Sequence, residues 1–200
     1  MTAAGIVGVL LAAGAGTRFG GDKLLAPLPP AAGAETGVPI GVAACAHLRA
    51  AVDEVVAVVR PEDGVLTAAL GAAGAVVVAC PRASDGMGAS LACGVAHAAH
   101  AQGWLIGLAD MPWIVPRTMA MLATHLAQAD AIVVPRYRGR RGHPVGFGAA
   151  HRAALLALHG DMGARGIVQA HAGSVIDVDV DDPGVLRDVD TPQDLGVGSG

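Results

Sequence analysis

The segment from Val9 to Leu28, VLLAAGAGTRFGGDKLLAPL, joins an apolar run to a glycine-rich stretch that carries two cations, Arg18 and Lys23. Glycines allow backbone N–H groups to turn toward an anion, and fixed cations neutralise several phosphate charges. The segment therefore predicts a loop that binds a polyphosphate. A glycine-rich turn with two solvated charges is the simpler alternative.

Neither of two common phosphate motifs fits this loop. The dinucleotide motif G-x-G-x-x-G begins at Gly14 and Gly16, but Phe19 stands where its third glycine is needed. The P-loop motif G-x-x-x-x-G-K-[ST] is broken by Asp22, which displaces Lys23, and no Ser or Thr follows the lysine. A dinucleotide-binding oxidoreductase stays open as an alternative, although Phe19 speaks against it.

An aspartate follows a later apolar run in the segment LADMPWI, where Asp110 comes at the end of an expected strand. Mg²⁺ is a hard cation that prefers carboxylate and phosphate oxygens, so Asp110 is a candidate metal ligand. The alternative is that Asp110 caps the next turn.

Three further segments carry polar residues between expected elements. In GMGASL, Ser90 lies in the first turn of an expected helix, where N–H groups are unpaired, and the simplest role for Ser90 is to cap that helix. The segment YRGRRGHPVGFG contains three arginines and then His143, and solvated surface charge is the usual explanation of such a run. In DVDTPQDL, Asp190 or Thr191 is a candidate N-cap of a helix that begins at Pro192.

The segment LAAGAGTRFGGDK resembles the signature L-A-A-G-x-G-x-R-x-G-x-x-K of the nucleotidyltransferase superfamily that joins a nucleoside monophosphate to a phosphorylated acceptor. LADMP, GMGASL, RGHPVGF and DVDTPQDL resemble further motifs of that superfamily. They are similar to those of molybdenum cofactor cytidylyltransferases, and the LAAG opening differs from the LAGG of the guanylyltransferase branch. The signature matches at Leu11, Ala12, Ala13, Gly14, Gly16, Arg18, Gly20 and Lys23.

This resemblance implies roles for the matching residues. Arg18, Lys23 and Asp110 are expected to be catalytic. The cations Arg18 and Lys23 would stabilise the charge that builds up in phosphoryl transfer, and Asp110 would act as a metal ligand. Asp110 and Asp190 are expected to hold Mg²⁺. The expected nucleotide and acceptor contacts are Leu11, Ala12, Ala13, Gly14, Gly16, Arg18, Lys23, Gly88, Ser90, Asp110 and His143, with Gly88 and Ser90 near the nucleobase and ribose.

The implied reaction transfers a nucleoside monophosphate from a triphosphate, with CTP favoured, to molybdopterin or molybdenum cofactor and releases pyrophosphate. His143 would contact this acceptor, and Arg140 and Arg141 would meet its phosphate. A phosphate with a second pKa of about 6 is already anionic at neutral pH, so no general base is required. A guanylyltransferase that uses GTP, a transferase with another acceptor, and a non-catalytic accessory protein that hands cofactor to a molybdoenzyme are the alternatives.

The elements that must position these residues alternate along the chain. Because most of the β-branched runs are apolar throughout, they indicate strands that are covered on both faces. We predict one domain over 1–200 with a three-layer, Rossmann-like α/β fold, in which helices flank a mostly parallel sheet on both faces. The resemblance implies the nucleotide-diphospho-sugar transferase type of this fold. The predicted strands are 6–12, 54–59, 75–79, 104–108, 131–135 and 174–180, and the predicted helices are 38–51, 65–71, 89–101, 116–128 and 149–158, with a surface loop at 29–37.

Composition excludes several other classes of protein. Hydrophobic residues make up 53% of the 200 residues and charged residues 15%, so the chain is not disordered. A formal net charge of −4 argues against general binding to nucleic acid or to a membrane surface. Three cysteines without metal-binding spacing and the lack of a basic leader predict a cytoplasmic protein.

Overall fold

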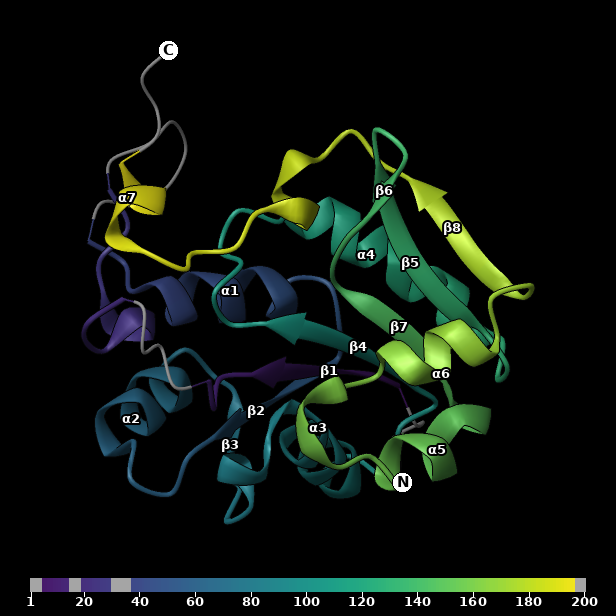
Figure 1. The fold of residues 1–200 in the computed structure, drawn as a ribbon, viewed down its shortest axis with the longest axis horizontal. Coiled ribbons are helices and arrows are strands. Elements are labelled where there is room, and N and C mark those ends of the chain that lie inside the picture. Colours follow the sequence, from purple (N-terminus) through teal and green to yellow (C-terminus); the bar gives the residue numbers. More distant parts are fainter. Residues whose placement is uncertain (1–4, 15–18, 30–36, 197–200) are drawn as a thin grey trace.

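The computed structural model describes residues 5–14, 19–29 and 37–196. Its centre is an eight-stranded sheet with the order β3-β2-β1-β4-β7-β5-β6, in which β8 also pairs with β5 (Figure 1). Strands β3, β2, β1 and β4 run parallel, and β7 is antiparallel to both β4 and β5. The strands are β1 (Ile6–Leu11), β2 (Glu54–Val59), β3 (Val76–Ala79), β4 (Gly103–Leu108), β5 (Ile132–Tyr137), β6 (Arg140–Arg141), β7 (Val145–Gly148) and β8 (Val175–Asp179).

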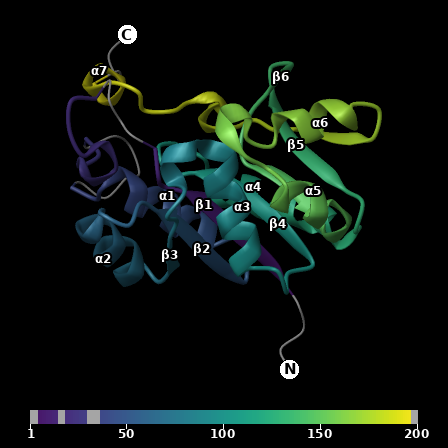
Figure 2. The same cartoon turned by 60° about the horizontal axis from the view of Figure 1, so that its bottom comes forward.

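Helices cover both faces of this sheet (Figures 1 and 2). Adjacent residues of a strand point to opposite faces, so Leu10 of β1 packs in a core with Leu48 of α1 and Leu122 of α4. Its neighbour Val9 packs in the opposite core with Leu91 of α3. The helices are α1 (Ile40–Arg49), α2 (Gly64–Ala72), α3 (Met87–His97), α4 (Pro116–Thr124), α5 (Arg152–Leu156), α6 (Arg165–Ala170) and α7 (Pro192–Leu195).

The observed architecture confirms the predicted α/β fold with a mostly parallel sheet between helical layers. Each predicted strand and helix overlaps an observed one. Strands β6 and β7 and helix α6 were not predicted from the sequence, and residues 30–36 of the predicted loop lie outside the described part of the chain. None of the helices in the described ranges has the length and apolar character that a bilayer span requires.

The carboxyl ends of β1 and β4 meet at one edge of the sheet, because Leu11 pairs with Leu108. In Figure 1 both arrows point toward the short 3₁₀ helix η1 (Lys23–Leu25) and the yellow segment that leads to α7. The backbone N–H of Val189 in that segment donates to the Asp110 carbonyl at 2.9 Å. The fold therefore brings the C-terminal segment and the glycine-rich loop together at the end of β4.

An ion pair ties β6 to β8 across β5. The Arg141 Nε and Nη2 groups donate to the two carboxylate oxygens of Asp177 at 2.6 and 2.8 Å. The hydrogen bonds from Arg141 lower the pKa of the Asp177 carboxyl below its ordinary value. Arg141 therefore forms an ion pair within the protein, whereas the resemblance implied that it contacts an acceptor phosphate.

We expect Asp177→Asn to lower the free energy of unfolding at pH 7 by about 0.2–1 kcal/mol, the range for solvent-exposed pairs. A lowered carboxyl pKa stabilises the fold above the unfolded pKa, and this contribution is lost as the pH falls through the folded pKa. Denaturant unfolding at several pH values should therefore show a difference in unfolding free energy between the wild type and Asp177→Asn that is constant from about pH 7 to pH 5 and shrinks below about pH 4.

Asp179→Asn on the same strand is the matched control, because Asp179 is 81% exposed and contacts Arg136 only at 3.4 Å. Asp179→Asn should lower the free energy of unfolding by less than half as much as Asp177→Asn. Equal losses of unfolding free energy in the two variants would contradict a stabilising ion pair between Arg141 and Asp177. So would a difference between Asp177→Asn and the wild type that persists at low pH.

Candidate active site at the end of strand β4

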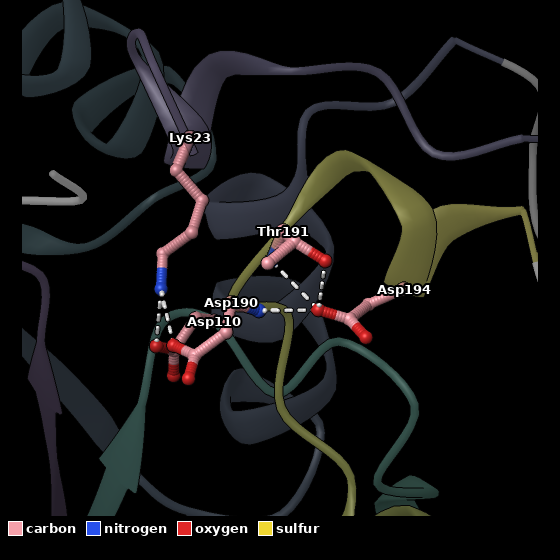
Figure 3. Close-up of polar contacts among 5 residues, drawn as sticks. All are labelled: Lys23, Asp110, Asp190, Thr191 and Asp194. Atoms are coloured by element: carbon pink, nitrogen blue, oxygen red, sulfur yellow. Dashed lines mark hydrogen bonds and ion pairs between the residues drawn. The ribbon is translucent and has the colours of Figure 1, made fainter. Parts of the chain in front are cut away.

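Lys23 lies between two carboxylates that come from distant parts of the chain (Figure 3). Its Nζ is 2.7 Å from Oδ2 of Asp110, at the end of β4, and 3.8 Å from Oδ1 of Asp190, just before α7. The Lys23 side chain is only 12% exposed, whereas Asp110 is 25% and Asp190 46% exposed. Three residues that were predicted from separate motifs are thus brought together around one cation position.

The start of α7 fixes the direction of the Asp190 side chain. Oδ2 of Asp194 accepts hydrogen bonds from the backbone N–H groups of Asp190 and Thr191, at 3.0 and 2.6 Å, and from the Thr191 hydroxyl at 2.9 Å. The hydrogen bonds from Thr191 lower the pKa of the Asp194 carboxyl. Thr191 is therefore the N-cap of α7, and the Asp190 carboxylate faces Lys23 instead of capping the helix.

Two cavities flank the glycine-rich loop at Gly14. A cavity of about 240 Å³, here called the α2-side cavity, is lined by Lys23, Ala12 and the first turn of α2. A cavity of about 360 Å³, the α3-side cavity, lies toward the start of α3. Its lining residues are Leu11, Ala13, Gly14, Arg60, Ala83, Ser84, Gly86, Met87, Ser90, Leu108, Asp110 and Asp161. The predicted nucleotide-binding residues of β1 and its loop, where described, line these two cavities.

Arg60 is a cavity residue that the sequence analysis missed. It follows β2 directly, lines both cavities, and donates from Nε to the Ala13 carbonyl at 2.9 Å. This bond fixes the start of the glycine-rich loop and places a second cation, besides Lys23, in the cavity lining at Gly14. Its signal in the sequence was a charged residue at the carboxyl end of an apolar strand, which is where open α/β sheets bind ligands.

We expect Arg60→Met to weaken nucleoside triphosphate binding by about ten- to a hundredfold, the usual effect of losing a hydrogen bond to a charged group. Titration calorimetry on the triphosphate measures this directly. Arg49→Met is the matched control, because Arg49 also donates to a carbonyl, that of Ala73 at 2.8 Å, but lines neither cavity. Equal affinities for the Arg60 variant and the wild type would exclude the assigned role.

The two predicted residues of α3 occupy different environments. Ser90 lines the α3-side cavity, and its hydroxyl donates to the Gly86 carbonyl at 3.4 Å. Gly88 is buried, and a Cβ there would lie 2.7 Å from the His159 carbonyl oxygen. Gly88 thus accommodates a neighbouring loop, while Ser90 faces the space where a ligand can enter.

His143 lies near the carboxylates of Asp110 and Asp188. Burial lowers the pKa of its imidazole, although the nearby charges of Asp110 and Asp188 favour the protonated form. Its Nδ1 atom is buried without a hydrogen-bond partner among the described residues. His143 is therefore a neutral side chain beside Asp110 at neutral pH.

The predicted site residues Gly16 and Arg18 lie outside the part of the chain that the structure describes.

Comparison with known proteins gives one consistent family. The family model described as the MobA-like NTP transferase domain matches residues 8–175. The purine catabolism protein PucB of Bacillus subtilis (strain 168) is 31% identical over 207 residues, covering 94% of this chain and 93% of that protein. Nicotine blue oxidoreductase of Paenarthrobacter nicotinovorans is also 31% identical and covers 95% of this chain and 94% of its own.

A solved structure agrees with these matches. The crystal structure of Rv0371c from Mycobacterium tuberculosis H37Rv has a TM-score of 0.78 at 31% identity and covers 96% of both chains. A structure of Rv0371c in complex with manganese has a TM-score of 0.73 at 29% identity and covers 95% of both chains. Since the family model spans most of the sequence and relatives align over nearly their full length, the chain belongs to the MobA-like NTP transferases.

Proposed function

We propose that the protein transfers a nucleoside monophosphate from a triphosphate, preferably CTP, to a phosphorylated acceptor of the molybdopterin type and releases pyrophosphate. The arrangement of Lys23 between Asp110 and Asp190, beside the glycine-rich loop, carries this proposal. It combines a fixed cation for phosphates with paired carboxylates for a metal ion. The choice of CTP and of the acceptor is supported by the resemblance of LAAG, GMGASL and RGHPVGF to the cytidylyltransferase motifs.

The carboxylate pair fits a divalent metal ion. Both side chains already converge on one positive group, the Lys23 ammonium, at 2.7 and 3.8 Å. No cluster of three or more His, Cys, Asp or Glu side chains suited to a metal occurs among the described residues. Mg²⁺ commonly uses one or two carboxylates together with substrate phosphates and water, so Asp110 and Asp190 would hold it in this way. When bound, Mg²⁺ would neutralise phosphate charge and orient the reacting groups.

The chain's own residues supply the rest of the reaction. An anionic oxygen of the acceptor phosphate attacks the α-phosphorus, a new P–O bond forms, and the bond to the β-phosphate oxygen breaks. Lys23 moves from the carboxylates to the phosphate oxygens and stabilises the charge that develops on them and on pyrophosphate. Arg18 is proposed to act with Lys23. The acceptor oxygen carries no proton at neutral pH, so no residue is needed to remove one.

The acceptor is assigned to the side of the cleft that carries His143. Because the imidazole is neutral, it would donate a hydrogen bond to the acceptor without adding charge. Arg141 is held by Asp177 and Arg138 stacks on the Tyr137 ring, which leaves the exposed Arg140 for an acceptor phosphate. The dinucleotide product would then pass to a molybdoenzyme.

Pyrophosphate release from each of the four nucleoside triphosphates, with molybdopterin or its molybdenum form as acceptor, tests this proposal. The expected result is acceptor-dependent release that is fastest with CTP. Binding of nucleotide or cofactor without release would instead indicate an accessory protein. Fastest release with GTP would indicate a guanylyltransferase.

One relative is named nicotine blue oxidoreductase, so an oxidoreductase activity is the second candidate function. An oxidoreductase that uses a nicotinamide dinucleotide would need its cofactor in the same cleft. NADH and NADPH should therefore be included in the binding experiments. Under the transferase proposal, neither should bind more tightly than CTP.

A further inference from the structure

A loop from the second half of the chain closes one side of the α3-side cavity. It follows α5, contains the 3₁₀ helix η5 (Gly160–Met162), and packs on the first turn of α3. Gly86 makes this contact possible: its φ of 116° favours glycine, and a Cβ there would collide with Asp161 and with the Gly160 backbone. The close packing places Asp161 at the cavity, far in sequence from the glycine-rich loop.

Asp161 is an unpaired acceptor at the rim of this cavity. It lines the cavity together with Gly14, Arg60 and Asp110. Within the described ranges it makes no hydrogen bond or ion pair, and its side chain is exposed. An ionised carboxylate can only accept hydrogen bonds, so a ligand that reaches Asp161 must present donors.

The charges around the cavity decide which part of a nucleotide can reach Asp161. The Asp161 carboxylate itself repels phosphates. The Lys23 ammonium, which lines the α2-side cavity together with three carboxylates, and the Arg60 guanidinium, which lines both cavities, attract them. The nucleoside carries the donors, as an exocyclic amino group on the base or as ribose hydroxyls. A volume of about 360 Å³ is within the range of small-ligand pockets.

We propose that Asp161 selects the nucleoside by accepting a hydrogen bond from one of these donors. This inference rests on the proposed function, because it takes the ligand of the cleft to be a nucleoside triphosphate. A carboxylate that accepts from an amino group distinguishes cytosine from uracil, and one that accepts from a ribose hydroxyl distinguishes ribonucleotides from deoxyribonucleotides.

The test measures affinities of ligand pairs that differ in one donor group: CTP with UTP, GTP with ITP, and CTP with 2′-deoxy-CTP. Titration calorimetry needs no acceptor, and Ca²⁺ can replace Mg²⁺ to prevent turnover. In the wild type, the member with the extra donor should bind at least about tenfold more tightly in one or more pairs, as expected for a hydrogen bond to a charged group. Asp161→Asn and Asp161→Ala should reduce that ratio to within about threefold.

Asp85→Asn is the matched control, because Asp85 is also exposed near the start of α3 but lines neither cavity. It should leave every ratio unchanged, and equal melting temperatures would show that all variants fold. Unchanged ratios in both Asp161 variants, or no preference in any pair for the wild type, would overturn the inference. Failure of the wild type to bind any triphosphate would instead overturn the proposed function.

Discussion

Lys23→Met is expected to reduce kcat/KM for the nucleoside triphosphate by at least about a hundredfold, the effect of losing one charge-stabilising group in a transition state. Methionine keeps much of the apolar stem but removes the ammonium that lies 2.7 Å from Asp110. Lys23 is the only lysine of the chain, so no neighbouring lysine can replace it. Steady-state pyrophosphate release measures the loss.

The same variant should bind metal ions differently in the absence of nucleotide. Without the ammonium, the Asp110 and Asp190 carboxylates lose the cation between them, so Mn²⁺ or Mg²⁺ should raise the melting temperature more in Lys23→Met than in the wild type. Arg117→Met, an exposed residue of α4, is the control for loss of one positive charge. Near-normal turnover together with an unchanged metal response would rule out the assigned role of Lys23.

Asp110→Asn should reduce turnover by at least about a hundredfold, and Asp190→Asn should raise the Mg²⁺ concentration needed for half-maximal activity. The double variant should be scarcely worse than the poorer single one, because residues that share one ligand act as a unit. A metal titration of activity for the three variants measures this coupling.

Asp181→Asn provides the matched control, since Asp181 is an exposed carboxylate in the same C-terminal segment. It should leave the Mg²⁺ requirement unchanged. Additive losses for Asp110 and Asp190 would mean that they do not hold one ion.

Most of the parallel half of the sheet was predictable from the sequence because its strands are buried on both faces. All interior positions of β1 and β2 are buried, which gives the continuous apolar runs that mark such strands. Strand β7 was missed for a physical reason. Its sequence VGFG has the glycines of a loop, but a Cβ at Gly146 would lie 2.9 Å from Leu126, so glycine allows the strand to pack closely.

A site residue could be predicted from the sequence where a motif surrounds it. Its role could not be predicted where that role depends on residues that are close in space but distant in the sequence. Lys23, Asp110 and Asp190 come from separate motifs and lie close together, but the spacing alone could not decide whether Asp190 or Thr191 is the N-cap of α7. Arg141 looked like a free cation because its partner, Asp177, is on a strand that follows much later. Arg60 was missed because a single charge after a strand is a weak signal, and Asp161 because no motif surrounds it; their position in one cavity shows only in the structure.

Transfer of label from CTP is the most direct test of nucleotidyl transfer by this protein. The protein is incubated with Mg²⁺, molybdopterin and CTP labelled at either the α- or the γ-phosphate, and the products are separated. We expect the α-label to appear in the acceptor product and the γ-label in pyrophosphate, at rates that fall together in Lys23→Met and Asp110→Asn. Release of the γ-label as free phosphate, or an acceptor product that carries the γ-label, would contradict nucleotidyl transfer at this site.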